Sequence, residues 1–113
     1  MLFMDWNSQI EAEFTKARQA RARGNEGQAR VCARRAAGYA AREYFTRLGR
    51  SVRTPSAYDL LNLLIEDPSL PDELHRSAEF LILRVNEEFK LPVDVDLISE
   101  AESLCAGLLK DNQ

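Results

Sequence analysis

Four arginines with helical spacing are the residues in this sequence with the clearest chemical potential. Arg30 and Arg34 are four positions apart, and Arg35 and Arg42 are seven positions apart, so one helix would carry them along two edges. Clustered arginines neutralise phosphates and release their counterions, which is the chemistry of an RNA- or nucleotide-binding surface. Alternatively, these arginines pair with carboxylates inside the protein or across a dimer interface.

The distribution of charge along the chain favours the pairing alternative. Residues 16–53 contain eleven basic and two acidic residues, whereas residues 54–113 contain four basic and thirteen acidic residues. The net charge of the whole chain is only −3. A basic half and an acidic half of nearly equal charge can neutralise each other, so nucleic acid is the less favoured partner.

Other residue types give no clear catalytic or metal site. The five glycines are scattered, so no phosphate-binding loop is formed. His75 is the only histidine, and we interpret it as a solvated surface residue, because no activated nucleophile lies near it in the sequence. One histidine and two cysteines fall short of the four ligands of a structural zinc site. We therefore predict no catalytic residue, no metal and no cofactor.

Three pairs of neighbouring carboxylates are the remaining candidates for acid–base or metal chemistry. One pair is placed to stabilise the first turn of a helix, one is placed to cap a helix, and one is expected on a solvated face. In that order they are Asp72-Glu73, Asp94 with Asp96, and Glu87-Glu88. We interpret all three pairs as structural.

Apolar residues recur with helical spacing through most of the chain and define the elements that carry these side chains. Their pattern predicts a first helix from near residue 5 to about residue 24, and a second from about residue 26 to residue 48. Asn25 is placed to cap the second helix in a capping box with Gln28, and Gly49 to end it. The small residues of the second helix predict close approach of its neighbours.

Proline and capping residues divide the remainder of the chain into three further helices. Thr54 and Pro55 predict the start of a third helix, which ends before Pro68. Residues 69–73 open a fourth helix, and residues 91–96 separate it from a fifth, which Asp96 or Asp94 caps. The predicted core stripe of the fourth helix consists of Leu74, Ala78, Leu81, Val85 and Phe89. The apolar face of the fifth helix consists of Leu97, Ala101, Leu104, Cys105 and Leu108.

The length of 113 residues and the 45% hydrophobic content indicate one all-α domain over residues 1–113, an up-and-down bundle of four to five helices. The sequence has no apolar run near the 20 residues of a membrane span and no secretory signal at its start. Cys32 and Cys105 lie among apolar helical positions and are expected to be reduced core residues. Together these features predict a cytoplasmic protein without a membrane partner.

The segment from Gly24 to Phe45 resembles the second helix of HEPN domains, in which a small-residue helix follows a short Gly/Asn turn and ends in bulky apolar residues. Residues 56–61 resemble the short third helix of that family, and residues 81–92 resemble its helix before a proline-containing break. The resemblance covers most of the chain. It implies a homodimer with a protein partner, often of the nucleotidyltransferase type.

The resemblance also implies a non-catalytic member of that family. Its ribonucleases carry an arginine with a histidine a few residues later, and Arg84 matches the arginine. The positions for the histidine hold Phe89, Lys90 and Leu91 instead. We therefore predict that the protein is not an enzyme, although a ribonuclease site near Arg84 and Glu88 is a further alternative.

Gly24, Ala29, Ala33 and Ala36 also match half of a tetratricopeptide repeat, which leaves a helical adaptor as another alternative. No second copy recurs at a period near 34 residues. The leading hypothesis is a self-associating interaction protein that binds a protein partner. In this hypothesis the core or interface residues include Trp6, Tyr39, Tyr44 and Phe45. The second hypothesis is RNA or nucleotide binding through Arg30, Arg34, Arg35 and Arg42.

Overall fold

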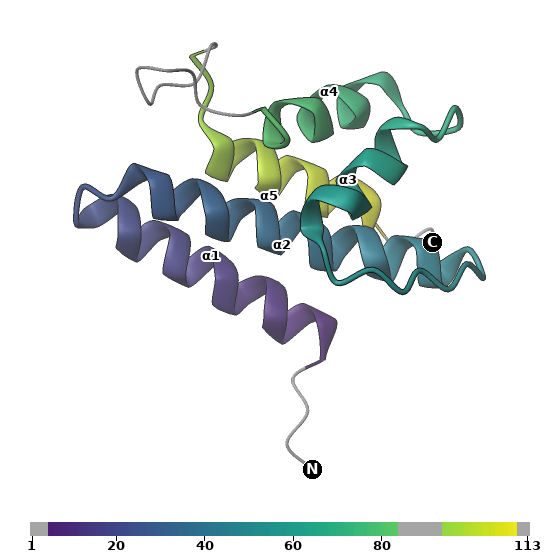
Figure 1. Ribbon diagram of the computed structural model, residues 1–113, viewed down its shortest axis with the longest axis horizontal. Coiled ribbons are helices and arrows are strands. Elements are labelled where there is room, and N and C mark those ends of the chain that lie inside the picture. The colour runs from purple at the N-terminus through teal and green to yellow at the C-terminus, as the bar shows by residue number, and fades with distance from the viewer. Residues whose placement is uncertain (1–4, 84–93, 111–113) are drawn as a thin grey trace.

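The computed structural model describes residues 5–83 and 94–110, and all regular secondary structure in these two ranges is helical (Figure 1). The five helices are α1 (Trp6–Ala22), α2 (Glu26–Arg47), α3 (Ala57–Ile65), α4 (Asp72–Leu81) and α5 (Leu97–Leu108). The predicted all-α class is therefore confirmed. No helix in the described ranges is long and apolar enough to cross a membrane.

α1 and α2 form an antiparallel hairpin whose turn follows the predicted signals. Gly24 has φ of 80°, a left-handed conformation that suits glycine, and Asn25 caps α2 by accepting a hydrogen bond from the backbone N–H of Gln28 at 3.1 Å. The reciprocal half of the predicted capping box is absent. The side-chain amide of Gln28 instead donates to the Sγ of Cys32, one turn further along α2.

The central helix of the bundle is α2, and its small residues make that position possible. Ala29, Ala33, Ala36, Ala37, Ala40 and Ala41 are all fully buried. Short side chains allow helix axes to approach closely, so α1 and α5 both pack against α2. Cys32 and Cys105 are buried and not bonded to each other, and burial raises the pKa of the Cys105 thiol to about 12.

The longer helices alternate in direction, as predicted for an up-and-down bundle. α5 runs antiparallel to α1, since Asp96 at its start contacts Arg21 near the end of α1. α4 runs antiparallel to α5, because Ser77 donates to Glu100 at 2.8 Å and Leu74 lies against Gly107. In consequence α2 and α5 are parallel neighbours, and the Sγ of Cys105 lies 3.8 Å from the carbonyl oxygen of Ala36.

The third helix starts two residues later than predicted. The cap is Ser56, whose hydroxyl accepts from the backbone N–H of Asp59 at 3.2 Å, and Pro55 therefore precedes the cap. Thr54 contributes differently: its hydroxyl accepts from the backbone N–H of Ser56 and donates to the Asp59 carboxylate. The capping position predicted for Thr54 is therefore held by Ser56.

The fourth helix ends earlier than predicted. Its last residue is Leu81, and Ile82 is the C-cap, so the helix does not run on unbroken past Leu81 as predicted. The carbonyl groups at a helix end need donors from elsewhere. The Nε of Arg34 on α2 donates to the carbonyl oxygen of Leu81 at 2.6 Å and thereby supports this end. Val85 and Phe89 themselves lie outside the described residues.

Candidate binding groove between the second and third helices

Three of the four predicted arginines line one groove, and the fourth does not. Arg34, Arg35 and Arg42 lie along a hollow of about 430 Å³ between residues 31–42 of α2 and residues 55–60, called the α2/α3 groove below. Arg30 lies one turn before Arg34 and is half-buried. Its Nε is buried and has no hydrogen-bond partner among the described residues. Three of the four predicted arginines therefore line the groove, and Arg30 is not part of it.

The connection between α2 and α3 builds the groove by folding back along α2. In Figure 1 this connection and the start of α3 return from the end of α2 to its middle. Gly38 makes the approach possible. A Cβ atom at Gly38 would lie 2.7 Å from the Cβ and 2.9 Å from the Cα of Ala57, which is closer than real contacts allow. Only glycine at this position lets the first residue of α3 rest against α2.

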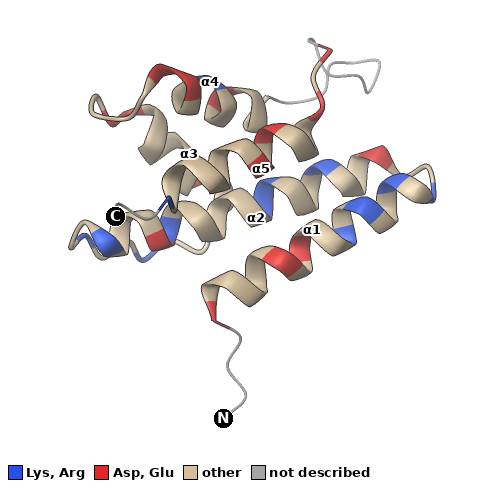
Figure 2. Ribbon diagram, turned by 180° about the vertical axis from the view of Figure 1, so that it is seen from behind, with Lys and Arg blue, Asp and Glu red and all other residues tan. Residues whose placement is uncertain are grey.

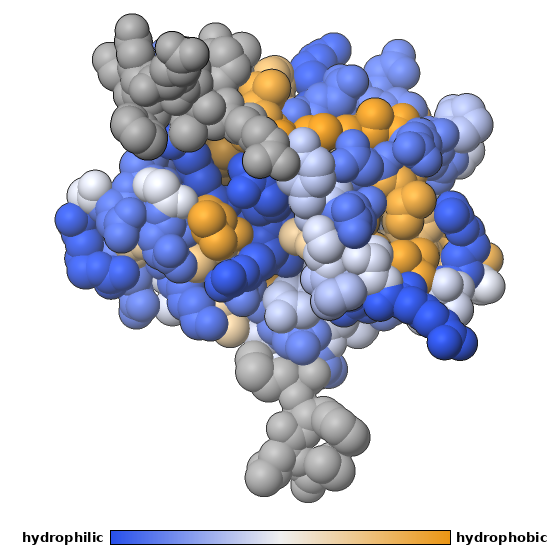
Figure 3. Space-filling view, in the orientation of Figure 1, coloured by the Kyte–Doolittle hydropathy of each residue, from blue (hydrophilic) through white to orange (hydrophobic). Residues whose placement is uncertain are grey.

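The groove combines cationic and apolar surface. Its non-arginine lining includes the side chains of Val31, Tyr39, Pro55 and Leu60, and no lining residue in the described part of the chain is acidic. Figure 3 shows the face on which α3 covers α2, where hydrophobic residues lie in separate patches among hydrophilic ones. Such a surface suits a ligand that carries negative charge and an apolar group together.

Backbone carbonyl groups hold two of the groove arginines in place. The Nη2 of Arg42 donates to the carbonyl oxygen of Thr54 at 2.6 Å, which ties α2 to the connection before α3. Arg34 reaches the other way and donates to the carbonyl oxygens of Leu81 and Leu83. A guanidinium has five N–H donors, and a carbonyl does not neutralise its charge. Arg42 is thus oriented by one bond and remains a cation with further donors.

Arg35 differs from both of these neighbours because it is exposed. It makes no ion pair and no hydrogen bond within residues 5–83 and 94–110. Its charge is therefore available at the mouth of the groove.

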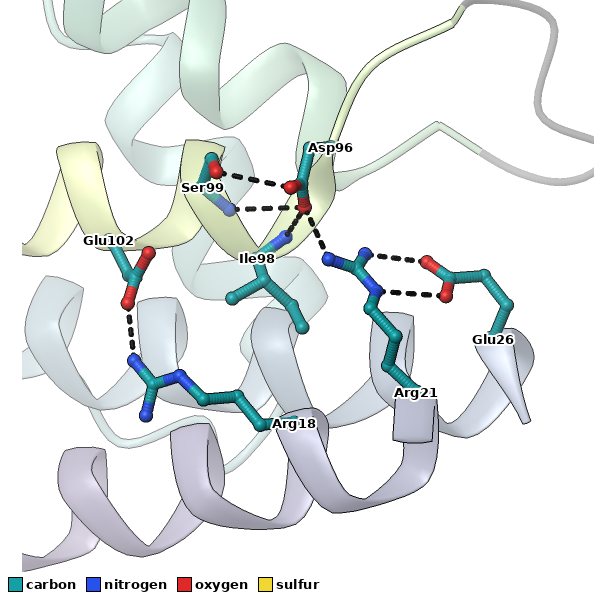
Figure 4. A network of polar contacts seen from close by, with 7 residues as sticks. All are labelled: Arg18, Arg21, Glu26, Asp96, Ile98, Ser99 and Glu102. Atoms are coloured by element: carbon teal, nitrogen blue, oxygen red, sulfur yellow. Dashed lines mark hydrogen bonds and ion pairs between the residues drawn. The ribbon is translucent and has the colours of Figure 1, made fainter. Parts of the chain in front are cut away.

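The arginines of α1 are neutralised by carboxylates (Figure 4). Arg18 pairs with Glu102 of α5. Arg21 binds both carboxylate oxygens of Glu26, at 3.0 and 2.7 Å, and one oxygen of Asp96 at 2.9 Å. We refer to these five residues as the ion-pair cluster. Figure 2 shows the wider arrangement: basic residues lie mainly on the α1–α2 hairpin, which also carries acidic residues, whereas α4 and α5 carry mostly acidic ones.

Titration of the ion-pair cluster follows from its contacts. The hydrogen bonds to Glu26 raise the pKa of Arg21, and the same bonds lower the pKa of the Glu26 carboxyl. Burial acts to raise the pKa of Asp96, but hydrogen bonds from Arg21 and Ser99 outweigh it, so that this pKa is also lowered. The Asp96 carboxylate accepts hydrogen bonds from the backbone N–H groups of Ile98 and Ser99, which confirms Asp96 as the predicted cap of α5.

The other candidate chemical groups have structural roles, so far as they lie among the described residues. Asp72 and Glu73 are exposed in the first turn of α4, as predicted. His75 is not the solvated residue we expected, since it is half-buried and its Nε2 donates to the carbonyl oxygen of Asp67 at 2.7 Å. No group of metal ligands is found within residues 5–83 and 94–110. Arg84, Glu87 and Glu88 lie outside the described residues.

Sequence reasoning identified the groove arginines but not the groove. The carbonyl groups that orient Arg34 and Arg42 belong to residues distant in sequence, and spacing along one helix carries no information about them. One signal was available: Gly38 interrupts a run of alanines in the middle of α2, and an isolated glycine inside a helix often marks a close approach.

Comparison of the chain with protein-family models, with curated protein sequences and with solved structures finds no match.

Proposed function

We propose that this chain is a non-enzymatic helical interaction protein that self-associates and binds a protein partner at the α2/α3 groove. The observation that carries the proposal is the contrast between two sets of arginines. Those of α1 are neutralised by carboxylates, whereas Arg35 and Arg42 line a partly apolar groove with no carboxylate partner in the described part of the chain. A cationic groove with apolar walls is a surface on which a partner protein can contribute the missing carboxylates.

The resemblance to HEPN domains supports the same proposal. It implies a dimer and a nucleotidyltransferase-type partner, and it implies a non-catalytic protein because Phe89, Lys90 and Leu91 occupy the positions for the histidine after Arg84. The two buried, unbonded cysteines agree with a cytoplasmic location, which is part of the proposal.

Size-exclusion chromatography with light scattering, recorded at 260 and 280 nm, tests this function. We expect a dimer whose absorbance ratio is that of protein alone. A monomer, or a species that elutes with nucleic acid, would contradict the proposal as stated. The Arg35→Gln variant should elute as the dimer too, because the proposal places Arg35 in the groove for the protein partner and not at the dimer interface.

RNA or nucleotide binding is the second candidate, and one observation favours it. The three groove arginines lie beside the N-terminus of α3, and helix N-termini and arginines both attract phosphate. If phosphate contacts carry the binding, the affinity for single-stranded RNA must fall steeply as salt rises. Fluorescence anisotropy with a labelled decanucleotide at two salt concentrations checks this. An affinity that does not change with salt excludes the second candidate.

A further inference from the structure

We infer that the occupant of the α2/α3 groove is a short acidic segment of a partner protein, with one aliphatic or aromatic side chain beside its carboxylates. This inference rests on the proposed function and names the chemistry of its partner. It follows from the charge, the apolar lining and the length of the groove.

Charge is the first argument. Arg35 and Arg42 place two cations beside one hollow, and no acidic residue of the described chain lines it. Arginine and carboxylate form paired N–H···O bonds that are stronger than bonds between neutral groups. The ion-pair cluster shows this pairing in the same molecule, where Arg21 holds Glu26 through two bonds. A carboxylate from outside is the matching partner for Arg35 and Arg42.

The apolar lining is the second argument. Val31 and Tyr39 on α2 are half-buried, and they face Pro55 and Leu60 across the groove. A ligand of charged groups alone would leave this surface covered by water. Burying one leucine- or phenylalanine-sized side chain here contributes favourable free energy in proportion to the apolar area removed from water.

Length is the third argument and distinguishes a peptide from a nucleic-acid strand. Residues 31–42 of α2 span about 17 Å at 1.5 Å per residue, which an extended peptide covers with about five residues. Surfaces for single-stranded nucleic acid extend along a charged track for several nucleotides. Here the arginines on α1 are already neutralised by Glu102, Glu26 and Asp96, so they do not extend such a track.

The groove is also preorganised for its ligand. Arg42 is fixed by the carbonyl of Thr54, and the contact between Gly38 and Ala57 fixes the wall that α3 forms. Cations already held in place lose less side-chain entropy on binding, which favours affinity. Arg35 is the exposed exception and is expected to become ordered when the ligand binds.

A displayed library of random octapeptides, selected against the purified full chain, tests the inference. We expect enriched sequences to combine aspartate or glutamate with leucine, isoleucine, phenylalanine or tryptophan. Enrichment of basic sequences, or no enrichment over the unselected library, overturns the inference. The selected peptide is then labelled with fluorescein, and its affinity is measured by anisotropy.

Single charge removals then locate the binding site. Arg35→Gln should weaken the peptide about tenfold, because one charge-assisted contact is lost. Arg23→Gln is the matched control: it removes the same charge from an exposed residue at the α1–α2 turn, and the affinity should not change. Equal affinity of the wild type and the Arg35→Gln variant places the peptide elsewhere and overturns the inference.

A labelled decanucleotide of single-stranded RNA serves as the competing probe. If RNA binds the wild type, is lost in the Arg35→Gln variant and displaces the peptide, the groove is a nucleic-acid site, and the inference is wrong. If no peptide is selected but the chain is still a dimer free of nucleic acid, only the inference of an acidic occupant is wrong, and the proposed function stands. A monomer in the sizing experiment removes the proposed function itself.

Discussion

The ion-pair cluster and the α2/α3 groove use the same side chain for opposite purposes. In the cluster, Arg18 and Arg21 of α1 meet carboxylates of α5 and of the start of α2. In the groove, Arg42 is held by the neutral carbonyl of Thr54, and Arg35 extends into solvent. In the ion-pair cluster the arginine charges are neutralised by carboxylates of the same chain, whereas Arg35 and Arg42 in the groove remain charged and can bind a ligand.

This difference shows that the partner of an arginine decides its role more than its position in the sequence does. A carboxylate partner cancels the charge and links two helices. A carbonyl partner orients the guanidinium and leaves the charge intact. The strong charge imbalance between the two halves of the chain is therefore only partly explained by internal pairing, and Arg35 and Arg42 of α2 are among the cations without a carboxylate partner in the described part of the chain.

Gly38→Ala should have the largest effect, since it removes the approach that forms the groove. The added methyl would lie 2.7 Å from the Cβ of Ala57, so that α3 must shift. We expect a loss of about 1–3 kcal/mol in the free energy of unfolding, despite the higher helix propensity of alanine. Urea denaturation measures this quantity.

Gly27→Ala is the matched control for that change. A Cβ atom added at Gly27, in the first turn of α2, would have the Oδ1 of Asn25 as its nearest neighbour, at 3.8 Å, so the substitution should stabilise the protein by up to about 1 kcal/mol. An equal gain for both variants would show that α3 does not pack against Gly38.

Arg42→Gln should have the next largest effect, because it breaks the bond that ties α2 to Thr54. Losing a hydrogen bond from a charged donor to a half-buried carbonyl costs about 1–2 kcal/mol of unfolding free energy. Thermal unfolding followed by circular dichroism provides the measurement. Stability equal to that of the wild type would mean that the carbonyl oxygen of Thr54 bonds to water equally well and that the bond does not fix Arg42.

Arg21→Gln tests the other side of the comparison, and its effect should depend on pH. Its pairs are partly exposed, so at neutral pH the loss should be about 1 kcal/mol or less. Glu26 and Asp96 have lowered pKa values in the folded protein. The stability that they contribute is present above their ordinary pKa values of 4.5 and 3.8 and is lost as the pH falls through the folded values.

The difference in unfolding free energy between the wild type and the Arg21→Gln variant should therefore shrink on acidification from pH 7 to pH 3. Denaturation at both pH values reveals this change. A difference that stays constant would show that Arg21 acts by packing rather than by charge.

Arg35→Gln should have the smallest effect on stability, within about 0.5 kcal/mol of the wild type, because Arg35 is exposed and makes no bond to the described chain. The same denaturation assay applies. A larger loss would reveal a structural role for Arg35 and would weaken its assignment to the binding surface.

Much of the fold was predictable because its signals are local. Asn25 and Asp96 cap the helices that they were predicted to cap, and the apolar stripe of α5 is buried. Two of the errors occurred where a contact outside the helix itself affects the outcome. The end of α4 depends on Arg34, which lies 47 positions earlier, and the half-buried place of His75 depends on the carbonyl of Asp67.

The candidate site was predictable only as a set of residue types. The spacing of the arginines placed them on one helix, but the groove exists because residues 48–56 fold back along α2 and Gly38 accepts Ala57. The pairing of Arg18 with Glu102 and of Arg21 with Asp96 is set by how α1 lies beside α5. Sequence periodicity contains no information about that contact.

The most direct test of the account compares Arg18→Gln with Arg35→Gln, which remove the same charge from the ion-pair cluster and from the groove. Affinity for the selected acidic peptide is measured by anisotropy for both variants at one salt concentration. The account predicts about tenfold weaker binding for Arg35→Gln and unchanged binding for Arg18→Gln. Equal weakening in both would show that only overall charge matters, and it would contradict a specific site in the α2/α3 groove.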